Sequence, residues 1–238
     1  MRSLHPPDES CLIPCMPYRR TDNVVRKLAA RHTAILQAAR DEAAEGGMAA
    51  VQIAAVAARA GIAAGTVYRY FPSKTELIVA LIAAISEREI GELRRAAEAA
   101  PGPLSALAAS IATFAACALR HRRLAWAVTA ESTDDGIETL RLQYRRALAG
   151  EFQARIKAAV AGGHLPEQDA ALSARALIGA LLEGAIGPLA PAQSDKAAER
   201  DAVQMLTLLG LRMLGVLDAR ARGLVVQIAL PAAGKGEA

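Results

Sequence analysis

The spacing of apolar residues constrains the fold of this chain more than any other feature. From about residue 24, apolar side chains such as Leu28, Ile35 and Ala39 recur on one helix face, and Gly46-Gly47 ends the pattern. Aromatic residues make up only 3% of the chain, which further disfavours strands. The sequence therefore predicts an all-α protein. The later helices are expected near residues 53–60, 64–70, 73–98, 104–120, 122–131, 136–161, 168–187 and 196–218. Only 224–230, LVVQIAL, resembles a strand, and it alternates poorly.

The charge is concentrated in the N-terminal third of the chain. Between Arg19 and Leu77 there are nine Lys or Arg and five Asp or Glu, an excess that equals the net charge of +4 of the whole chain. Such a local basic excess permits nucleic acid as a partner without requiring it.

Cysteine usage and hydropathy exclude several classes of protein. Three cysteines are too few for a disulfide framework, and Cys11 and Cys15 have no second pair of Cys or His with metal-ligand spacing. We therefore expect no metal, no cofactor and a reducing cytoplasm. Glu183 and Arg212 interrupt the most apolar C-terminal segments, so no membrane span and no membrane partner are predicted.

Ala57, Gly61 and Val67 have the spacing of a helix-turn-helix pair. The first helix needs a small residue where the second crosses it, a glycine four residues later where the backbone turns left-handed, and then an apolar residue that packs back. Such a pair places its second helix in the major groove of DNA. The alternative is ordinary helical packing, in which Tyr70 and Phe71 are core residues.

If the pair does bind DNA, the residues of the second helix and of the next helix start have separate roles. Gly65 permits close approach to DNA, and Arg69 reaches a base edge or a phosphate. The next helix starts at a capping box, Ser73 with Glu76. The hydroxyls and the charge offered to phosphates belong to Thr66, Tyr68, Tyr70 and Lys74.

The segment VAARAGIAAGTVYRYFPSKTEL, residues 56–77, resembles the TetR family of bacterial transcriptional regulators. That family carries I-A-x-x-A-G-x-x-x-G-T-x-Y-x-Y-F-x-x-K-x-x-L in its N-terminal region. Gln52 and Ala63 depart from it, because they stand where the family often has a hydroxyl residue at a helix start. Val56 replaces the Ile, and the matching positions are Ala57, Ala60, Gly61, Gly65, Thr66, Tyr68, Tyr70, Phe71, Lys74 and Leu77.

The resemblance covers residues 26 to about 80 and implies a function for the whole chain. It implies a homodimer that binds a near-palindromic double-stranded DNA operator, usually as a repressor. It also implies a small-molecule effector, bound in the C-terminal domain, that releases the DNA.

The C-terminal helices supply the expected dimer and ligand residues. The helices near 168–187 and 196–218 are apolar nearly all round and must be covered on more than one side. Because the family pairs its last two long helices, the residues expected near the dimer interface are Leu177, Leu181, Leu206, Leu209 and Met213. Ordinary core packing is the alternative. The candidate pocket residues are Phe114, Cys117, Trp126, Thr129, Glu131, Arg141 and Tyr144. A pocket with so few aromatics is expected to be aliphatic and to suit an apolar effector.

The predicted domain organisation follows from these segments. It consists of a flexible leader at 1–22, a helix-turn-helix domain at 23–72, a helical ligand-binding and dimerisation domain at 73–220, and a tail at 221–238. An enzyme is not predicted, because no paired catalytic carboxylates, G-x-S-x-G, H-E-x-x-H or phosphate-binding glycine loop is present. A helical interaction protein that does not bind DNA is the other alternative.

Overall fold

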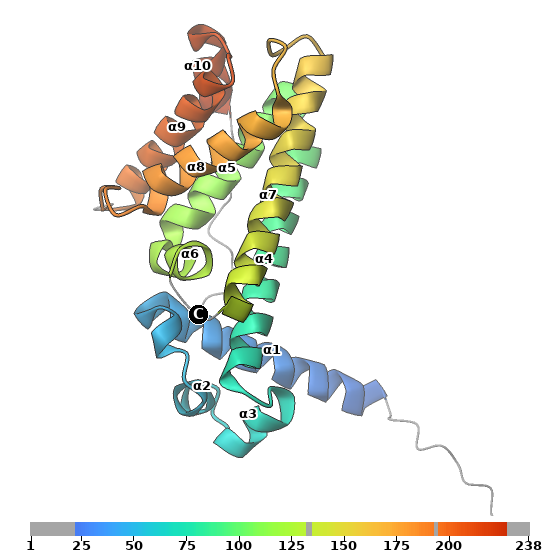
Figure 1. Ribbon diagram of the computed structural model, residues 1–238, viewed down its shortest axis with the longest axis vertical. Coiled ribbons are helices and arrows are strands. Elements are labelled where there is room, and N and C mark those ends of the chain that lie inside the picture. Colours follow the sequence, from blue (N-terminus) through green and yellow to red (C-terminus); the bar gives the residue numbers. More distant parts are fainter. Residues whose placement is uncertain (1–21, 132–134, 193–194, 228–238) are drawn as a thin grey trace, which may run out of the picture.

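The computed structural model describes residues 22–131, 135–192 and 195–227, and these residues form helices with no strand among them (Figure 1). The prediction of an all-α protein is therefore confirmed. The helices are α1 (Asp22–Gly46), α2 (Ile53–Arg59), α3 (Ala64–Tyr70), α4 (Lys74–Glu98), α5 (Pro103–Arg120), α6 (Arg122–Thr129), α7 (Asp135–Ala161), α8 (Ala170–Ile186), α9 (Lys196–Met213) and α10 (Asp218–Gln227), with a 3₁₀ turn at Met48–Ala50. Nearly all of the leader predicted at 1–22, with Cys11 and Cys15, lies outside the described residues.

Capping side chains mark the starts of α4, α8 and α9. The Ser73 hydroxyl accepts the backbone N–H of Glu76 at 3.1 Å, which begins α4 as the predicted capping box requires. Asp169 and Asp195 cap α8 and α9 in the same way. Gly163, with φ 68°, follows the end of α7.

The expected bounds of the last helix were wrong. The helix expected at 196–218 ends at Met213, because Gly215 takes φ 90° and turns the chain into a separate helix, α10. The strand-like segment LVVQIAL is helical as far as Gln227, and its last three residues lie outside the described part. The C-terminal tail predicted from 221 thus begins inside α10.

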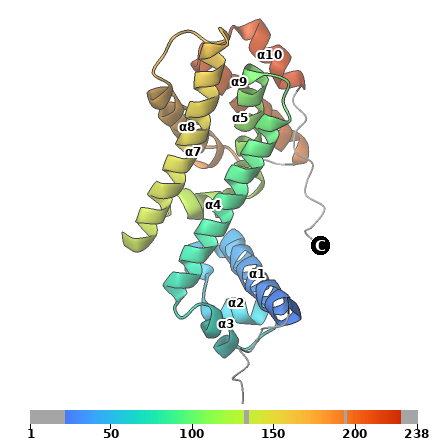
Figure 2. The same ribbon diagram turned by 90° about the vertical axis from the view of Figure 1, so that its right-hand side faces the viewer.

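The helices form two packed groups, which we call the head (α1 to α3) and the body (α4 to α10). The first turns of α4 lie beside the head, and the helix then runs up into the body (Figures 1 and 2). Inside the body, α5 packs against α4, α7, α8 and α9. α5 is therefore the central helix of the body.

α5 is also the one helix of the described residues that is long and apolar enough to pass a length and composition test for a membrane span, with 72% of it buried inside the protein. The sequence argument overlooked it, because its only charge, Arg120, is the last residue of the helix. Such burial is the property of a core helix.

Candidate functional site

The turn between α2 and α3 is built by one glycine. Gly61 has φ 64°, a left-handed conformation that side chains other than hydrogen rarely adopt. Its N–H donates to the carbonyl of Ala58 at 3.1 Å, and the N–H of Ile62 donates to the carbonyl of Ala57 at 3.0 Å. This pair of bonds is a Schellman motif, which ends α2 and redirects the chain into α3. Val67 of α3 then packs inward with no exposed surface, as its spacing predicted.

α3 presents a polar face to solvent. Gly65, Tyr68 and Arg69 are exposed, and 51% of Tyr68 is accessible. Nothing lies within 4 Å of the place where a Cβ on Gly65 would stand, so its small size serves no contact within the protein. The polar candidates that are partly buried are Thr66, Tyr70 and Lys74.

Tyr70 and Phe71 differ in their surroundings. Phe71 is 4% exposed and its ring centroid lies 5.0 Å from that of His32, so it is a core residue of the head. Tyr70 is partly exposed at 6.4 Å from the same His32 ring. The alternative of core packing therefore holds for Phe71 and only in part for Tyr70.

The surface beside α3 is positively charged. A groove of about 750 Å³ runs between α1 and the α2–α3 turn, and the charged residues that line it are Lys27, Arg31 and Arg69. No carboxylate is among its described lining residues. Arg59 is excluded from this role, because its guanidinium binds Glu42 and Glu45, each at 2.7 Å.

The residues around α6 connect the head to the body. A guanidinium N–H of Arg123 donates to the carbonyl of Gly46 at 3.1 Å, and the Glu131 carboxylate accepts the N–H of Met48 at 3.1 Å. On the head side, the Gly46 carbonyl is at the end of α1, and the Met48 N–H is at the start of the 3₁₀ turn that follows. α6 is therefore attached to the head at both of its own ends.

α7 holds α6 from the other side. The buried guanidinium of Arg141 donates to the carbonyls of Ala127 at 2.8 Å and Val128 at 3.2 Å. Arg145 donates to the carbonyl of Thr129 at 2.9 Å. These bonds satisfy the last carbonyls of α6, which a helix leaves without intrahelical partners.

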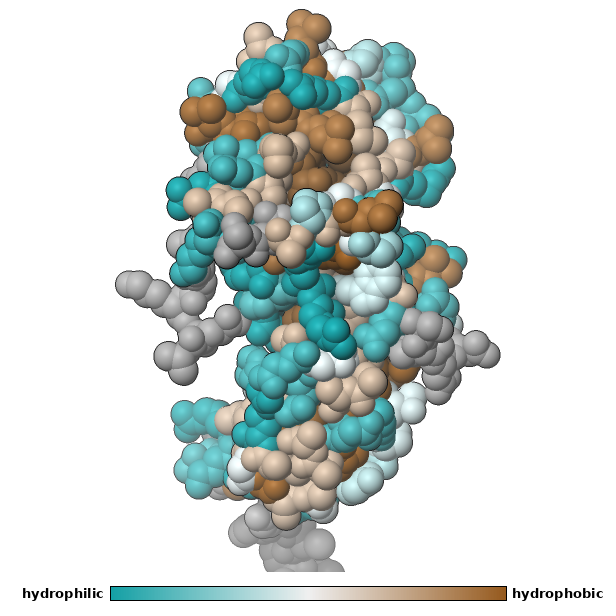
Figure 3. Space-filling model, turned by 90° about the vertical axis from the view of Figure 1, so that its left-hand side faces the viewer, coloured by the Kyte–Doolittle hydropathy of each residue, from teal (hydrophilic) through white to brown (hydrophobic). Residues whose placement is uncertain are grey.

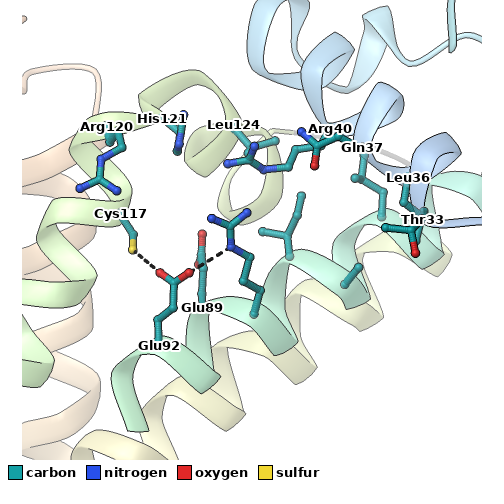
Figure 4. A pocket seen from close by; sticks show the side chains of 14 residues that line it. Thr33, Leu36, Gln37, Arg40, Glu89, Glu92, Cys117, Arg120, His121 and Leu124 are labelled. Atoms are coloured by element: carbon teal, nitrogen blue, oxygen red, sulfur yellow. Dashed lines mark hydrogen bonds and ion pairs between the residues drawn. The ribbon is translucent and has the colours of Figure 1, made fainter. Parts of the chain in front are cut away.

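A cavity of about 310 Å³ lies where α1 meets α4, α5 and α6 (Figure 4). Three arginines line it, Arg40, Arg88 and Arg120, together with the carboxyls of Glu89 and Glu92. Its volume is at the lower end of the range for small-molecule sites, about 300–1,000 Å³. We call it the junction cavity.

The two carboxyls of the junction cavity differ in pKa. Burial raises the pKa of Glu89, although the Tyr144 hydroxyl donates a hydrogen bond to it. Burial acts in the same direction on Glu92, but hydrogen bonds from Cys117 at 3.2 Å and Arg88 at 3.0 Å outweigh it and lower the pKa of Glu92. Burial, with the bond to Glu92, raises the pKa of the Cys117 thiol. The surroundings thus favour the charged form of Glu92 and the neutral form of Glu89.

The predicted pocket residues are spread over several places. Cys117 lines the junction cavity, whereas Phe114, Thr129 and Tyr144 line a space of about 10 Å³ that shares Glu89 with it. Arg141 is 2% exposed and is used by the α6 carbonyls, and Trp126 is 38% exposed and lines neither space. Glu131 lies on the contact with the head.

The predicted interface residues also separate into two groups. Leu177, Leu181 and Leu206 are 0%, 1% and 8% exposed, so the protomer itself buries them. Leu209 and Met213 are exposed, and so are Leu172 of α8 and Met205 of α9. Figure 3 draws the side of the molecule that lies on the left in Figure 1, and apolar residues gather on its upper half, where α8 to α10 lie.

The glycine-turned helix pair has the geometry of a helix-turn-helix motif, and a cationic groove lies beside its exposed polar helix. Residues 35–81 match the family model described as bacterial regulatory proteins, tetR family. The N-terminal part of the chain is therefore similar to the tetR family, as the motif at 56–77 indicated.

Relatives and solved structures agree with this assignment. The chain is 46% identical over 77 residues to the HTH-type transcriptional repressor KstR of Mycolicibacterium smegmatis, a match over 32% of this chain and 38% of that protein. The chain thus spans less than two fifths of the length of the curated relatives it matches.

Two solved structures share the fold over most of the chain. RolR in complex with resorcinol is 22% identical with a TM-score of 0.60 and covers 87% of this chain and 98% of its own. FadR from Bacillus subtilis in complex with stearoyl-CoA is 19% identical with a TM-score of 0.62, and the match covers 74% of this chain and 97% of FadR. FadR is described as a transcriptional regulator, and at these identities the likeness shows the fold.

Sequence reasoning missed the charged residues of the junction cavity and Arg123, and it named Glu131 for a pocket and not for its contact with the head. One signal was present: Leu81 and Ile85 begin an apolar stripe on α4 that Arg88, Glu89 and Glu92 continue with charge at the same helical spacing. A stripe that changes from apolar to charged within one helix indicates a polar interior site or a change of neighbour. For Arg123, whose partner is a backbone carbonyl, the sequence offers no signal.

Proposed function

We propose that this protein is a dimeric, sequence-specific DNA-binding regulator that represses transcription from a near-palindromic operator and is released by a small-molecule effector. The observation that carries the proposal is the α2–α3 pair, in which Gly61 directs α3 so that Val67 faces the core and Tyr68 and Arg69 face solvent. Repressor relatives support the direction of regulation.

The contacts proposed for DNA follow from the exposed groups. Gly65 at the start of α3 leaves room for the DNA backbone, and Arg69 reaches a base edge or a phosphate. The hydroxyls of Thr66, Tyr68 and Tyr70 and the ammonium group of Lys74 contact phosphates. The cationic groove between α1 and α3 adds a sequence-independent attraction, because Lys and Arg release counterions from DNA.

The dimer is proposed to form through the exposed apolar face of α8 and α9. Met205, Leu209 and Met213 are spaced four residues apart on α9, so they share one side of the helix. On α8, Leu172 is 58% exposed, and a Cβ on exposed Gly179 would meet nothing within 4 Å. An apolar face that one protomer leaves uncovered suits a second copy. The two heads would then read half-sites about 34 Å apart.

A small-molecule effector is supported by the solved structures of the same fold, which hold resorcinol and stearoyl-CoA. The attachment of α6 to both the head and α7 gives an effector in the body a physical route to α3. Any such effector acts through its difference in affinity for the two head arrangements. The protein is proposed to act in the cytoplasm, without a cofactor or metal.

The test is selection of bound sequences from random duplex DNA, followed by titration of the best sequence at several salt concentrations. We expect an inverted repeat with two chains bound and a steep fall of affinity with salt. The double variant Tyr68→Ala, Lys74→Ala should weaken binding and flatten the salt slope by about one unit, because two phosphate contacts are lost and only that of Lys74 is charged.

The matched control for that variant is Arg146→Ala, which removes an exposed charge on α7 of the body. The control should bind the operator as the natural chain does. If the double variant binds normally, the assignment of these contacts is wrong. If no sequence is enriched by a folded dimer, the protein is an interaction protein and the proposal fails.

A further inference from the structure

The first two residues of α6 are arginines whose guanidinium groups bind different parts of the protein. Arg122 donates to the carbonyls of Ala190, at 3.0 Å, and of Pro191, which lie in the connection between α8 and α9. Arg123 donates to the carbonyl of Gly46 at the end of α1. Because neighbouring residues on a helix project about 100° apart, one short segment can reach both sides. Two adjacent side chains therefore link the α8–α9 connection to the head.

The α8–α9 connection offers these carbonyls from a turn that its prolines stiffen. Pro188 stands at the second position of a turn that is closed by the N–H of Ala190, which donates to the carbonyl of Gly187 at 3.0 Å. Proline presets the backbone angle that this position requires. Pro191 restricts the backbone of Ala190 as well, because a residue before a proline is disfavoured in the helical region. The acceptors of Arg122 are thus held by their own local backbone.

On the head side, the link ends at the last residue of α1. The carbonyl of Gly46 is one of those that a helix leaves without an intrahelical partner, and the negative end of the α1 dipole lies there. A guanidinium group suits both properties, because it is charged and carries several donors. From Gly46 the chain continues through the 3₁₀ turn into α2 and α3, which pack with α1 in the head. The position of this carbonyl is therefore coupled to that of α3.

α6 lies between the head and the helices proposed for the dimer. Figure 1 shows α6 above α1 and below α8, and α6 packs against both. The exposed apolar face proposed for the dimer belongs to α8 and α9, whose connection Arg122 binds. α4 also packs against α1 and gives the head a second support. The route through α6 is the short one, because it crosses a single helix between the α8–α9 connection and the head.

We propose that Arg122 and Arg123 are positioning residues, which fix the head relative to the α8–α9 connection and so set the half-site spacing that a dimer accepts. Neither residue touches DNA in this role. In a two-fold dimer the freedom of one head is repeated in the other, so the separation of the two α3 helices varies with both. A head that turns freely fits operators of several spacings, whereas a fixed head fits one. The effect on operators rests on the function proposed above, whereas the fixed head does not.

The first test measures the position of the head within one chain and needs no DNA. Spin labels are attached through Ala54→Cys on α2 and Ala154→Cys on α7, two exposed alanines, one in the head and one in the body. Labelled chains are diluted with unlabelled chains, so that double electron–electron resonance reports distances within a chain. We expect a single narrow distance distribution. The natural cysteines are first replaced by serine, and these are Cys11, Cys15 and Cys117.

Removal of either arginine side chain should broaden or shift that distribution. Arg122→Ala and Arg123→Ala each break the link at one end. Arg123→Lys should keep the narrow distribution, because one ammonium group can donate to the one carbonyl that Arg123 uses. Arg122→Lys should keep it only in part, since Arg122 uses two nitrogens for two carbonyls. Arg146→Ala, at an exposed arginine of α7, is the matched control and should change nothing.

Thermal unfolding separates this role from a purely stabilising one. If the two alanine variants unfold at a lower temperature but keep the natural distance distribution, α4 alone holds the head, and the positioning role is refuted. A broadened or shifted distribution in variants that remain folded supports it. The lysine variants keep the test decisive even if an alanine variant fails to fold.

The second test uses the selected operator with one base pair inserted between its half-sites. The natural chain should lose about tenfold or more in affinity, because one base pair moves a half-site by about 3.4 Å and turns it by about 35° around the DNA axis. Arg122→Ala and Arg123→Ala should lose less, and Arg146→Ala should lose as much as the natural chain. Equal losses in all four proteins refute the control of spacing. If no operator is selected, the proposed function fails, and the spin labels still decide whether the arginines fix the head.

Discussion

Gly61 and Gly65 offer a test in which one kind of substitution has opposite effects four residues apart. In both places a Cβ would meet nothing within 4 Å, so steric contact does not distinguish them. The backbone does, because Gly61 has φ 64° and Gly65 lies within α3. Alanine at Gly61 must take a left-handed conformation, which costs about 1–2 kcal/mol. Alanine at Gly65 improves helix propensity by up to about 1 kcal/mol.

We therefore expect Gly61→Ala to lower the free energy of unfolding and Gly65→Ala to raise it, measured by urea unfolding followed with far-UV circular dichroism. Operator affinity should fall in both variants, but for different reasons: the first misplaces α3 and the second adds a methyl group to the proposed DNA surface. A stabilised Gly65→Ala protein with normal operator affinity would refute the close approach of DNA at this position. A Gly61→Ala protein of unchanged stability would refute the role of the left-handed turn.

Three further predictions concern the body and its junction with the head. Burial raises the pKa of Glu89, and the titratable and charged groups near it are Tyr144, Glu92, Cys117, Arg40 and Arg88. Protonated Glu89 therefore stabilises the fold below the ordinary pKa of 4.5, and this stability is lost as pH rises through the raised pKa. Glu89→Gln, which can still accept the Tyr144 hydrogen bond, should be the more stable protein at neutral pH, and parallel pH profiles of unfolding free energy for the two proteins would contradict this. Leu209→Glu should give monomers or aggregate in analytical ultracentrifugation, whereas Leu142→Glu, of similar exposure on α7 (45% against 46%), should stay dimeric; a stable Leu209→Glu dimer would place the interface elsewhere. Arg123→Ala should lower the unfolding free energy by about 0.5–1.5 kcal/mol through loss of its bond to the Gly46 carbonyl, and no change in a urea titration would mean that this contact does not stabilise the protein.

The head was predictable from sequence because local rules determine it. The turn that requires Gly61 is closed by hydrogen bonds between residues five and three positions apart in the chain. The hydrogen bond of the Ser73 cap likewise joins residues three positions apart. Such short-range requirements leave a recognisable spacing. The order and approximate ends of the helices up to Ile186 followed from the same kind of signal.

The body was less predictable because its sites form between distant segments. Leu177 and Leu209 look alike in sequence, yet the first packs inside the protomer and the second faces outward, since only the packing of α5 against α8 and α9 decides between them. Arg141 looked like a ligand contact because a polar residue on a core helix usually needs a partner. Its partners are backbone carbonyls of α6, which periodicity in the sequence does not reveal.

The two bonds that join α6 to the head limit how the head can turn. A rigid body held at one point can swivel in any direction, but one held at two points can rotate only about the line through them. Arg123 and Glu131 supply two such points, at the Gly46 carbonyl and the Met48 N–H. These two bonds restrict the head to rotation about the line through Gly46 and Met48, and α4, which follows α3 in the chain and packs against α1, restricts that rotation further.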